Sequence, residues 1–114
     1  MGSASVRDAF DLSGRVVMIT GGAGFFGLKH AEGIAEMGGS PVILDLNGAA
    51  AEERARSIAN SFGVKSLGIE TDVTSADSVR DALAQTLESL GRVDVLINNA
   101  ANDPKVGGTN DSGE

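Results

Sequence analysis

Three glycines, Gly21, Gly24 and Gly27, recur at intervals of three directly after a short apolar run at residues 16–19. A strand that enters a glycine-rich turn and then a helix can present backbone N–H groups to a phosphate. Each glycine then has a physical reason. One makes a tight turn, one lets an anion approach the backbone, and one lets the helix pack closely on the strand. The spacing alone is a weak signal, because a plain glycine turn would produce it nearly as well.

An acidic side chain follows at the interval that a nucleotide ribose requires. Asp45 lies near the end of a second apolar run at residues 41–46, 18 positions after Gly27 and next to Leu46. A carboxylate there can accept hydrogen bonds from both hydroxyl groups of an adenosine ribose, and it repels a 2′-phosphate. The glycine turn offers no Lys or Arg to neutralise such a phosphate. The pattern therefore favours NAD over NADP, with a plain strand-end turn as the alternative role for Asp45.

Two further groups complete the predicted site. Asp72 can accept a hydrogen bond from an adenine amino group, with Val73 against the ring, and capping of the turn at residues 71–75 is an equal alternative for Asp72. The small residues after Asn98 leave room for a nucleotide close to the backbone, and they are Asn99, Ala100 and Ala101. The alternative role for Asn98 and Asn99 is to tie neighbouring loops through side-chain bonds.

Apolar runs and helix-forming stretches alternate along the chain. Strands are expected at residues 15–20, 41–46, 65–70 and 92–98. Helices are expected at residues 25–37 and 49–62, and from a cap at Ser75 or Asp77 to about residue 90. This alternation predicts an α/β fold with a doubly wound parallel sheet, truncated to about four strands in the order 3-2-1-4 and three helices.

Apolar residues also predict which helix faces pack on the sheet. In the first helix the expected inward residues include Phe26, Ile34 and Met37. The third helix carries one apolar stripe, made of Val79, Leu83, Leu87 and Leu90. Ligands of open α/β sheets bind beyond the carboxyl ends of the strands, so the crevice is expected between residues 21–27 and residues 98–101.

Composition and charge exclude several classes of function. With 9 Lys and Arg against 16 Asp and Glu, the formal net charge is −7, which disfavours binding to nucleic acid and to anionic membranes. The absence of cysteine excludes disulfide bonds and thiolate metal sites, and we expect no bound metal. No apolar stretch approaches the roughly 18 residues of a transmembrane helix, and the first residues lack the apolar stretch of a signal peptide. We therefore expect a cytoplasmic protein.

Four motifs occur in order: TGGAGFFG at residues 20–27, Asp45, TDVT at residues 71–74 and NNAA at residues 98–101. Together they resemble the short-chain dehydrogenase/reductase family over about residues 10–101. The resemblance implies a Rossmann fold that binds NAD(P), in which Asn98 braces the sheet and does not touch the ligand. The predicted cofactor-binding residues are Gly21, Gly24, Phe25, Phe26, Gly27, Asp45, Leu46, Asp72, Val73, Asn99, Ala100 and Ala101.

The expected domain organisation follows from the same span. Residues 10–101 form a partial Rossmann domain, residues 1–9 a flexible N-terminus and residues 102–114 a polar loop or frayed tail. The glycine spacing is that of the extended branch of the family, because Phe25 stands where short-form members carry the middle glycine, whereas NNAA is similar to the short-form NNAG. The subgroup and the substrate class are therefore left unassigned.

The groups that carry hydride transfer in that family have no counterpart here. The resemblance would require a Ser, a Tyr-x-x-x-Lys helix and a more distant Asn, and the chain contains no tyrosine. We assign no catalytic residue and expect the cofactor-binding part of an NAD-dependent oxidoreductase of alcohols or ketones, inactive when alone. A full-length protein would bind a small-molecule substrate and could form a homo-oligomer. Two alternatives stay open: a stand-alone, non-catalytic nucleotide-binding module and, more distantly, another Rossmann enzyme such as a methyl-donor-dependent transferase.

Overall fold

The structure, a computed structural model, describes residues 10–99 of the chain. In this range the elements are β1 (Val16–Thr20), α2 (Phe25–Glu36), β2 (Ser40–Asp45), α3 (Gly48–Phe62), β3 (Leu67–Glu70), α4 (Ala76–Leu90) and β4 (Val95–Asn98). The predicted alternation of strands and helices is confirmed. The strands β1, β3 and β4 begin one to three residues later than expected, and β2 begins and ends one residue earlier.

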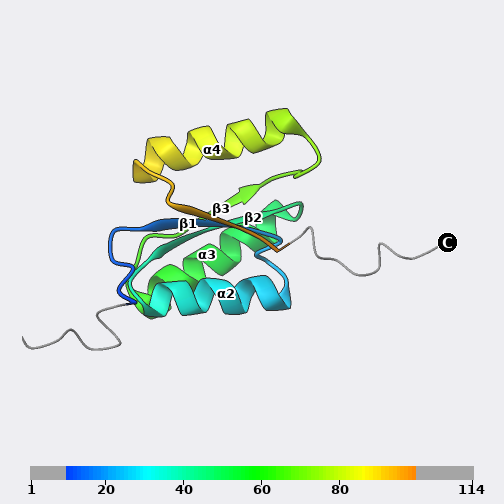
Figure 1. Ribbon diagram of the computed structural model, residues 1–114. Coiled ribbons are helices and arrows are strands. Elements are labelled where there is room, and N and C mark those ends of the chain that lie inside the picture. The colour runs from blue at the N-terminus through cyan, green and yellow to red at the C-terminus, as the bar shows by residue number, and fades with distance from the viewer. Residues whose placement is uncertain (1–9, 100–114) are drawn as a thin grey trace, which may run out of the picture.

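All four strands are parallel and lie in the order β3-β2-β1-β4, as predicted. The helices α2 and α3 cover one face of the sheet, and α4 covers the other (Figure 1). The central strand β1 pairs with β2 on one side and with β4 on the other. Because the strands are parallel, their carboxyl ends meet at one edge of the sheet, where Thr20, Asp45, Glu70 and Asn98 end them.

The core consists of two layers, one on each face of the sheet. All five residues of β1 are buried, which explains why its sequence is apolar without a polar alternation. Val17 and Ile19 pack toward the α2 and α3 side, with Ile34 and Ile58. The residues of the other layer pack toward α4 and are Val16, Met18, Val42, Leu44, Ile69 and Ala82.

Polar caps and glycines set the ends of two helices. The Asn47 side chain accepts the N–H of Ala50 at 3.0 Å and begins α3. The Ser75 hydroxyl accepts the N–H of Ser78 at 3.2 Å and begins α4, so Ser75 rather than Asp77 is the cap. Both helices end at a glycine in the left-handed region, Gly63 and Gly91.

The helix α4 packs on the sheet through small and polar residues. Ala82 and Thr86 are its buried residues, and the Thr86 hydroxyl donates to the carbonyl of Ala82 at 2.8 Å. Three members of the predicted apolar stripe, Val79, Leu83 and Leu87, are 38 to 45% exposed. The stripe therefore exists, but within the described residues it is only partly covered.

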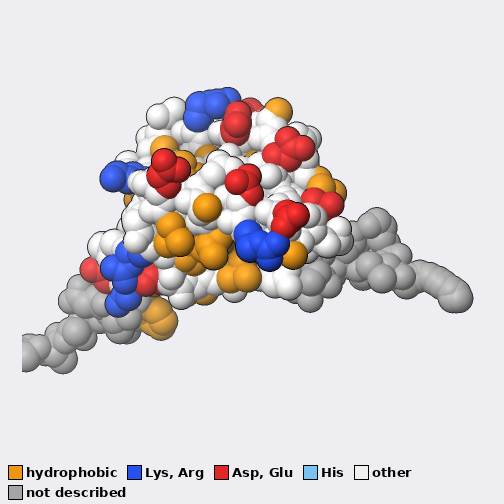
Figure 2. All heavy atoms as spheres, turned by 90° about the horizontal axis from the view of Figure 1, so that it is seen from above, with side chains coloured by type: hydrophobic (Ala, Val, Ile, Leu, Met, Phe, Trp, Pro, Cys, Tyr) orange, Lys and Arg blue, Asp and Glu red, His pale blue; other side chains and the backbone are white. Residues whose placement is uncertain are grey.

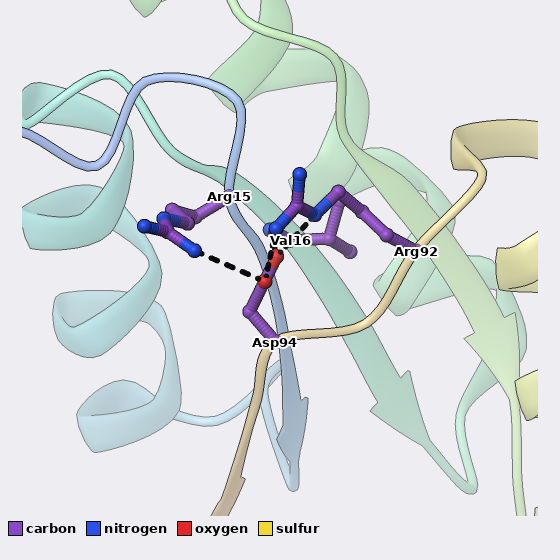
Figure 3. A network of polar contacts seen from close by, with 4 residues as sticks. All are labelled: Arg15, Val16, Arg92 and Asp94. Atoms are coloured by element: carbon purple, nitrogen blue, oxygen red, sulfur yellow. Dashed lines mark hydrogen bonds and ion pairs between the residues drawn. The ribbon is translucent and has the colours of Figure 1, made fainter.

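The start of β4 is fixed to β1 by Asp94 at the amino edge of the sheet. Its carboxylate accepts the backbone N–H of Val16 at 2.9 Å, and its own N–H donates to the Val16 carbonyl at 2.9 Å. Arg92 donates to both carboxylate oxygens, and Arg15 contacts one of them at 3.5 Å (Figure 3). The hydrogen bonds from Arg92 and from the Val16 amide lower the pKa of Asp94 to about 2. A side chain thus joins the two strands where the regular ladder has not begun.

Candidate functional site

Of the three glycines in the predicted motif, two are required by the protein itself: Gly21, in the turn between β1 and α2, and Gly27, in the first turn of α2. Gly21 has a φ of 66°, and its N–H donates to the Leu44 carbonyl of β2 at 2.8 Å. A Cβ on Gly27 would lie 2.4 Å from the Gly21 carbonyl oxygen and 2.5 Å from the Gly22 Cα. These glycines therefore make the tight turn and the close helix contact that the spacing predicted.

Gly24, the middle glycine, has no such requirement. Its φ of −79° suits any residue, and a Cβ there would meet only the Gly21 oxygen, at an ordinary 3.6 Å. Gly24 is the N-cap of α2, and it supplies no side-chain hydrogen bond. In the described helix no acidic residue occupies the first turn, and the N–H groups of Phe25, Phe26 and Gly27 have no carbonyl partner within the helix. An anionic diphosphate fits this open, positively polarised helix end.

Phe25 and Phe26 form an exposed aromatic pair beside this helix end. They are 68% and 69% exposed, with ring centroids 5.2 Å apart in a T-shaped arrangement. The Lys29 ammonium lies 5.8 Å from the Phe25 ring centroid. The prediction that Phe26 faces the core is wrong. The adjacent Gly27 is the residue pressed against the turn, and a helix rotates each successive residue by about 100°, which directs Phe26 away from the sheet.

Asp45 stands at the carboxyl end of β2 with its side chain between two loops. One carboxylate oxygen accepts the N–H of Ala23 in the glycine turn at 3.2 Å, and the other accepts the N–H of Asn47 at 3.0 Å. Its backbone carbonyl accepts the N–H of Thr71, beyond β3, at 2.8 Å. The carboxylate is therefore held beside the turn, as the ribose role requires.

A cavity of about 170 Å³ opens beside Asp45. Five predicted site residues come together in its wall: Gly21, Asp45, Leu46, Asp72 and Val73. Sequence reasoning missed the other lining residues, Leu44, Thr71 and Thr74. Leu44 could have been found because residues two apart in an extended segment point to the same side, as Leu44 and Leu46 do. Thr71 and Thr74 could have been found because they belong to the TDVT motif.

Asp72 caps its own turn in this cavity wall. One carboxylate oxygen accepts the hydroxyl of Thr74 and also the Thr74 backbone N–H, at 3.0 Å for the latter. These two hydrogen bonds lower the pKa of Asp72. The capping alternative is therefore confirmed. The carboxylate is also an ionised acceptor at the mouth of the cavity, so the adenine role stays a prediction.

The end of β4 meets the glycine turn. The Thr20 hydroxyl donates to the Asn98 side-chain oxygen at 2.9 Å, which is the expected bracing of the sheet. Asn99 donates from its amide nitrogen to the Gly21 carbonyl at 3.4 Å. Ala100 and Ala101 lie outside the described residues. Asn99 and the α2 residues Phe25 and Phe26 do not line the cavity beside Asp45.

A second hollow lies on the other side of Val73, between α4 and β4. It has a volume of about 370 Å³ and a largely apolar wall, formed by Met18, Thr20, Leu44, Val73, Val79, Leu83, Val93, Leu96 and Asn98. We call it the α4–β4 groove. Hydrophobic side chains gather on the α4 face of the molecule (Figure 2). Leu96 of β4, which lines the groove, is 58% exposed.

Two other kinds of site are absent from residues 10–99. No group of three or more His, Asp or Glu side chains is placed to hold a metal ion in this part of the chain. Nor does any helix in it combine the length and apolar character needed to cross a membrane.

The glycine turn, Asp45 and the end of β4 all lie in a stretch that matches a known protein family. The family model described as short chain dehydrogenase matches residues 15–112. The chain belongs to the short-chain dehydrogenases. This membership confirms the resemblance seen in the four sequence motifs, and it leaves the methyl-donor alternative without support.

Individual short-chain dehydrogenases show how much of such a protein this chain represents. The short chain dehydrogenase/reductase astE of Aspergillus oryzae is 34% identical over 95 residues, which cover 83% of this chain and 36% of the relative. The solved NADPH-dependent 3-quinuclidinone reductase of Rhodotorula rubra is 38% identical with a TM-score of 0.77, covering 84% and 36% of the two chains. A solved NAD⁺-bound xylitol dehydrogenase is 32% identical with a TM-score of 0.70, covering 75% and 32%.

The chain therefore spans about a third of the length of these short-chain dehydrogenases. The two solved structures differ in cofactor, one being described as NADPH-dependent and the other as NAD⁺-bound. Family membership thus indicates a nicotinamide dinucleotide, and the choice between NAD and NADP depends on this chain's own residues.

Proposed function

We propose that this chain binds NAD as the cofactor-binding part of an oxidoreductase that transfers hydride between NAD(H) and an alcohol or ketone. When bound, NAD would accept or donate the hydride. The proposal depends chiefly on one observation, the Asp45 carboxylate held at the end of β2 in the wall of the cavity. In that position a carboxylate suits a free ribose diol and opposes a 2′-phosphate.

The proposed placement of the cofactor follows the order of the groups along the carboxyl edge of the sheet. The adenosine would occupy the cavity, with its ribose at Asp45 and its adenine between Asp72 and Val73. At about 170 Å³ the cavity is smaller than the roughly 300 Å³ typical of sites that enclose a whole small ligand, so it suits only one end of a dinucleotide. The diphosphate would lie at Gly24 and the start of α2, and the remaining half would extend toward residues 99–101.

Catalysis is proposed to reside in residues outside this chain. The 114 residues contain no tyrosine, the general acid of the family's hydride transfer. A complete protein would act on a small-molecule substrate and could form a homo-oligomer. The missing tyrosine also favours one second candidate function, a nucleotide-binding module that does not catalyse, for which residues 10–101 would be the binding unit.

Titration calorimetry with NAD and NADP tests the cofactor assignment. We expect saturable binding of NAD and weaker binding of NADP by the 114-residue chain. Asp45→Ala should weaken NAD binding by roughly tenfold to a hundredfold, the cost of losing hydrogen bonds to a charged group, and should narrow the preference over NADP. Glu88→Ala, which removes an exposed charge from α4, is the matched control and should change neither affinity. If Asp45→Ala binds NAD and NADP with the same affinities as the wild type, Asp45 takes no part in cofactor binding.

The two candidate functions are separated by the intact mass and the activity of the natural protein. A natural product that carries a Tyr-x-x-x-Lys helix and reduces NAD with an alcohol supports the oxidoreductase. A natural product of 114 residues that binds NAD without turnover supports the module instead.

A further inference from the structure

We propose that Asp45 is a positioning residue for the glycine turn, in addition to its role at the ribose. Its carboxylate ties the turn to the start of α3 and so holds the backbone N–H groups that would receive the diphosphate. This inference rests on the proposed function for its ligand, but the tie itself is a property of the protein without ligand.

The contacts of the carboxylate carry the inference. The Ala23 N–H donates to one oxygen at 3.2 Å, and Ala23 lies between the turn glycines Gly22 and Gly24. The Asn47 N–H donates to the other oxygen at 3.0 Å. Asn47 in turn caps α3 through its bond from Ala50. One carboxylate therefore connects the second half of the turn to the N-terminus of a 15-residue helix.

The other hydrogen bonds of the turn do not replace this connection. Gly21 and Gly22 donate to the Leu44 carbonyl at 2.8 and 3.4 Å, which fixes the first half of the turn to β2. Gly24 donates to Gly21 within the turn itself, at 3.2 Å. The Gly24 carbonyl accepts the N–H of Leu28 at 2.9 Å, which joins the turn to α2. Within residues 10–99, the bond from Ala23 to Asp45 is thus the hydrogen bond that links the second half of the turn to the sheet. Gly24 and the start of α2 follow directly after it.

The two roles of Asp45 make opposite predictions for a ligand without a ribose. Inorganic pyrophosphate presents the diphosphate alone. If Asp45 only recognised the ribose, removing its negative charge would leave pyrophosphate binding unchanged or strengthen it, because the carboxylate repels an anion. If Asp45 positions the turn, the same change weakens pyrophosphate binding, because the N–H groups lose their fixed arrangement.

Asp72 provides a matched control for charge. It is a second carboxylate in the wall of the same cavity, and its hydrogen bonds from Thr74 stay within its own turn. Asp72→Ala therefore removes a negative charge from the same cavity without releasing the glycine turn. We expect pyrophosphate to bind Asp72→Ala as well as or better than the wild type.

The experiment combines amide hydrogen exchange of the ligand-free chain with an NMR titration of inorganic pyrophosphate. In Asp45→Ala the Ala23 amide should exchange about tenfold faster than in the wild type, the expected effect of losing a bond to a charged acceptor. Pyrophosphate binding should be several-fold weaker than in Asp72→Ala. Asp45→Asn keeps one acceptor oxygen and the size of the side chain, so its Ala23 exchange rate and its pyrophosphate affinity should lie between those of the wild type and Asp45→Ala. It replaces Asp45→Ala in the experiment if that variant does not fold.

Each result decides one point. Unchanged exchange at Ala23 in both Asp45 variants overturns the positioning role, and so does pyrophosphate binding by Asp45→Ala that equals that of Asp72→Ala. A wild-type chain that binds neither NAD nor pyrophosphate overturns the proposed function. In that case the Ala23 exchange rate still decides whether Asp45 holds the turn.

Discussion

At the scale of single residues, the glycines of the motif have different roles: Gly27 is needed for the stability of the fold, whereas Gly24 is proposed to serve ligand binding. Gly27 is needed for packing, since a Cβ would press on the turn backbone at 2.4 Å. Gly24 has room for a side chain, and its extended conformation at the N-cap of α2 suits serine. Because Gly24 has no side chain, the space in front of α2 stays open, and the diphosphate is proposed to lie there.

We therefore expect Gly24→Ser to stabilise the fold slightly while weakening NAD binding. A serine cap improves on glycine by about a few tenths of a kcal/mol, but its side chain would fill the space in front of the first-turn N–H groups. Thermal unfolding and NAD titration of the same variant check both effects. Gly27→Ala is the contrasting variant and should lower stability by about 1–3 kcal/mol through overpacking. Tight NAD binding by Gly24→Ser would contradict the placement of the diphosphate.

The sequence could predict where site residues stand along the chain, but not the bonds they make. The interval after the glycine turn predicts Asp45, the position just past the third expected strand predicts Asp72, and both residues line the cavity. The bond from Ala23 to Asp45 depends on how the turn folds back over β2, which no local pattern encodes. Phe26 was misplaced because its hydrophobicity suggested burial, whereas its direction is set by the tight contact at Gly27.

At the scale of elements, the fold was predictable because its signals are periodic and strong. The buried run of β1 and the glycine stops of α3 and α4 place those elements within a few residues. The apolar side chain of Val93 lengthens the apolar run toward its N-terminus, so β4 is predicted to begin three residues before its observed start. There β4 contacts β1 through the Asp94 carboxylate and through one backbone bond, from the Asp94 N–H to the Val16 carbonyl, and the regular ladder begins at Val95. Sequence periodicity cannot distinguish these two kinds of pairing.

The contacts of Asp94 with Val16 and Arg92, here called the Asp94 clamp, predict that the free energy of unfolding depends on pH. Its pKa is lowered to about 2 by the bonds from Arg92 and from the Val16 amide, whereas an unfolded Asp titrates near roughly 4. The folded state therefore binds the proton less readily, so the clamp contributes fully above about pH 4 and is lost as pH falls through about 2. Urea unfolding of the wild type and Asp94→Asn should differ at pH 7 and converge toward pH 2. Asp81→Asn, exposed on α4, is the control. A difference that stays constant with pH would contradict this role.

At the scale of the whole molecule, the two faces of the sheet are unequally covered. Two helices pack on one face, and α4 alone packs on the other, where β4 forms an edge of the sheet (Figure 1). The exposed residues Val95 and Leu96 lie on this edge strand, and Leu96 lines the α4–β4 groove. An apolar edge strand is a template for association between chains.

We therefore expect the 114-residue chain to self-associate as its concentration rises. Leu96→Ser should reduce this association with little effect on stability, because Leu96 is already 58% exposed. Sedimentation velocity over a concentration series measures it. Phe10→Ser removes an equally exposed apolar side chain, 62% exposed, outside the sheet. Equal reduction by both substitutions would mean that general surface hydrophobicity, not the β4 edge, drives the association.

Leu44 and Val73 belong to the walls of both hollows, the cavity beside Asp45 and the α4–β4 groove. A displacement of either side chain therefore changes the shape of both hollows. Whatever fills the groove and shifts Val73 changes the free energy of filling the cavity, and a ligand in the cavity changes affinity at the groove by the same factor. Such reciprocal coupling would need no hinge or domain motion, because the two hollows share the side chains of Leu44 and Val73.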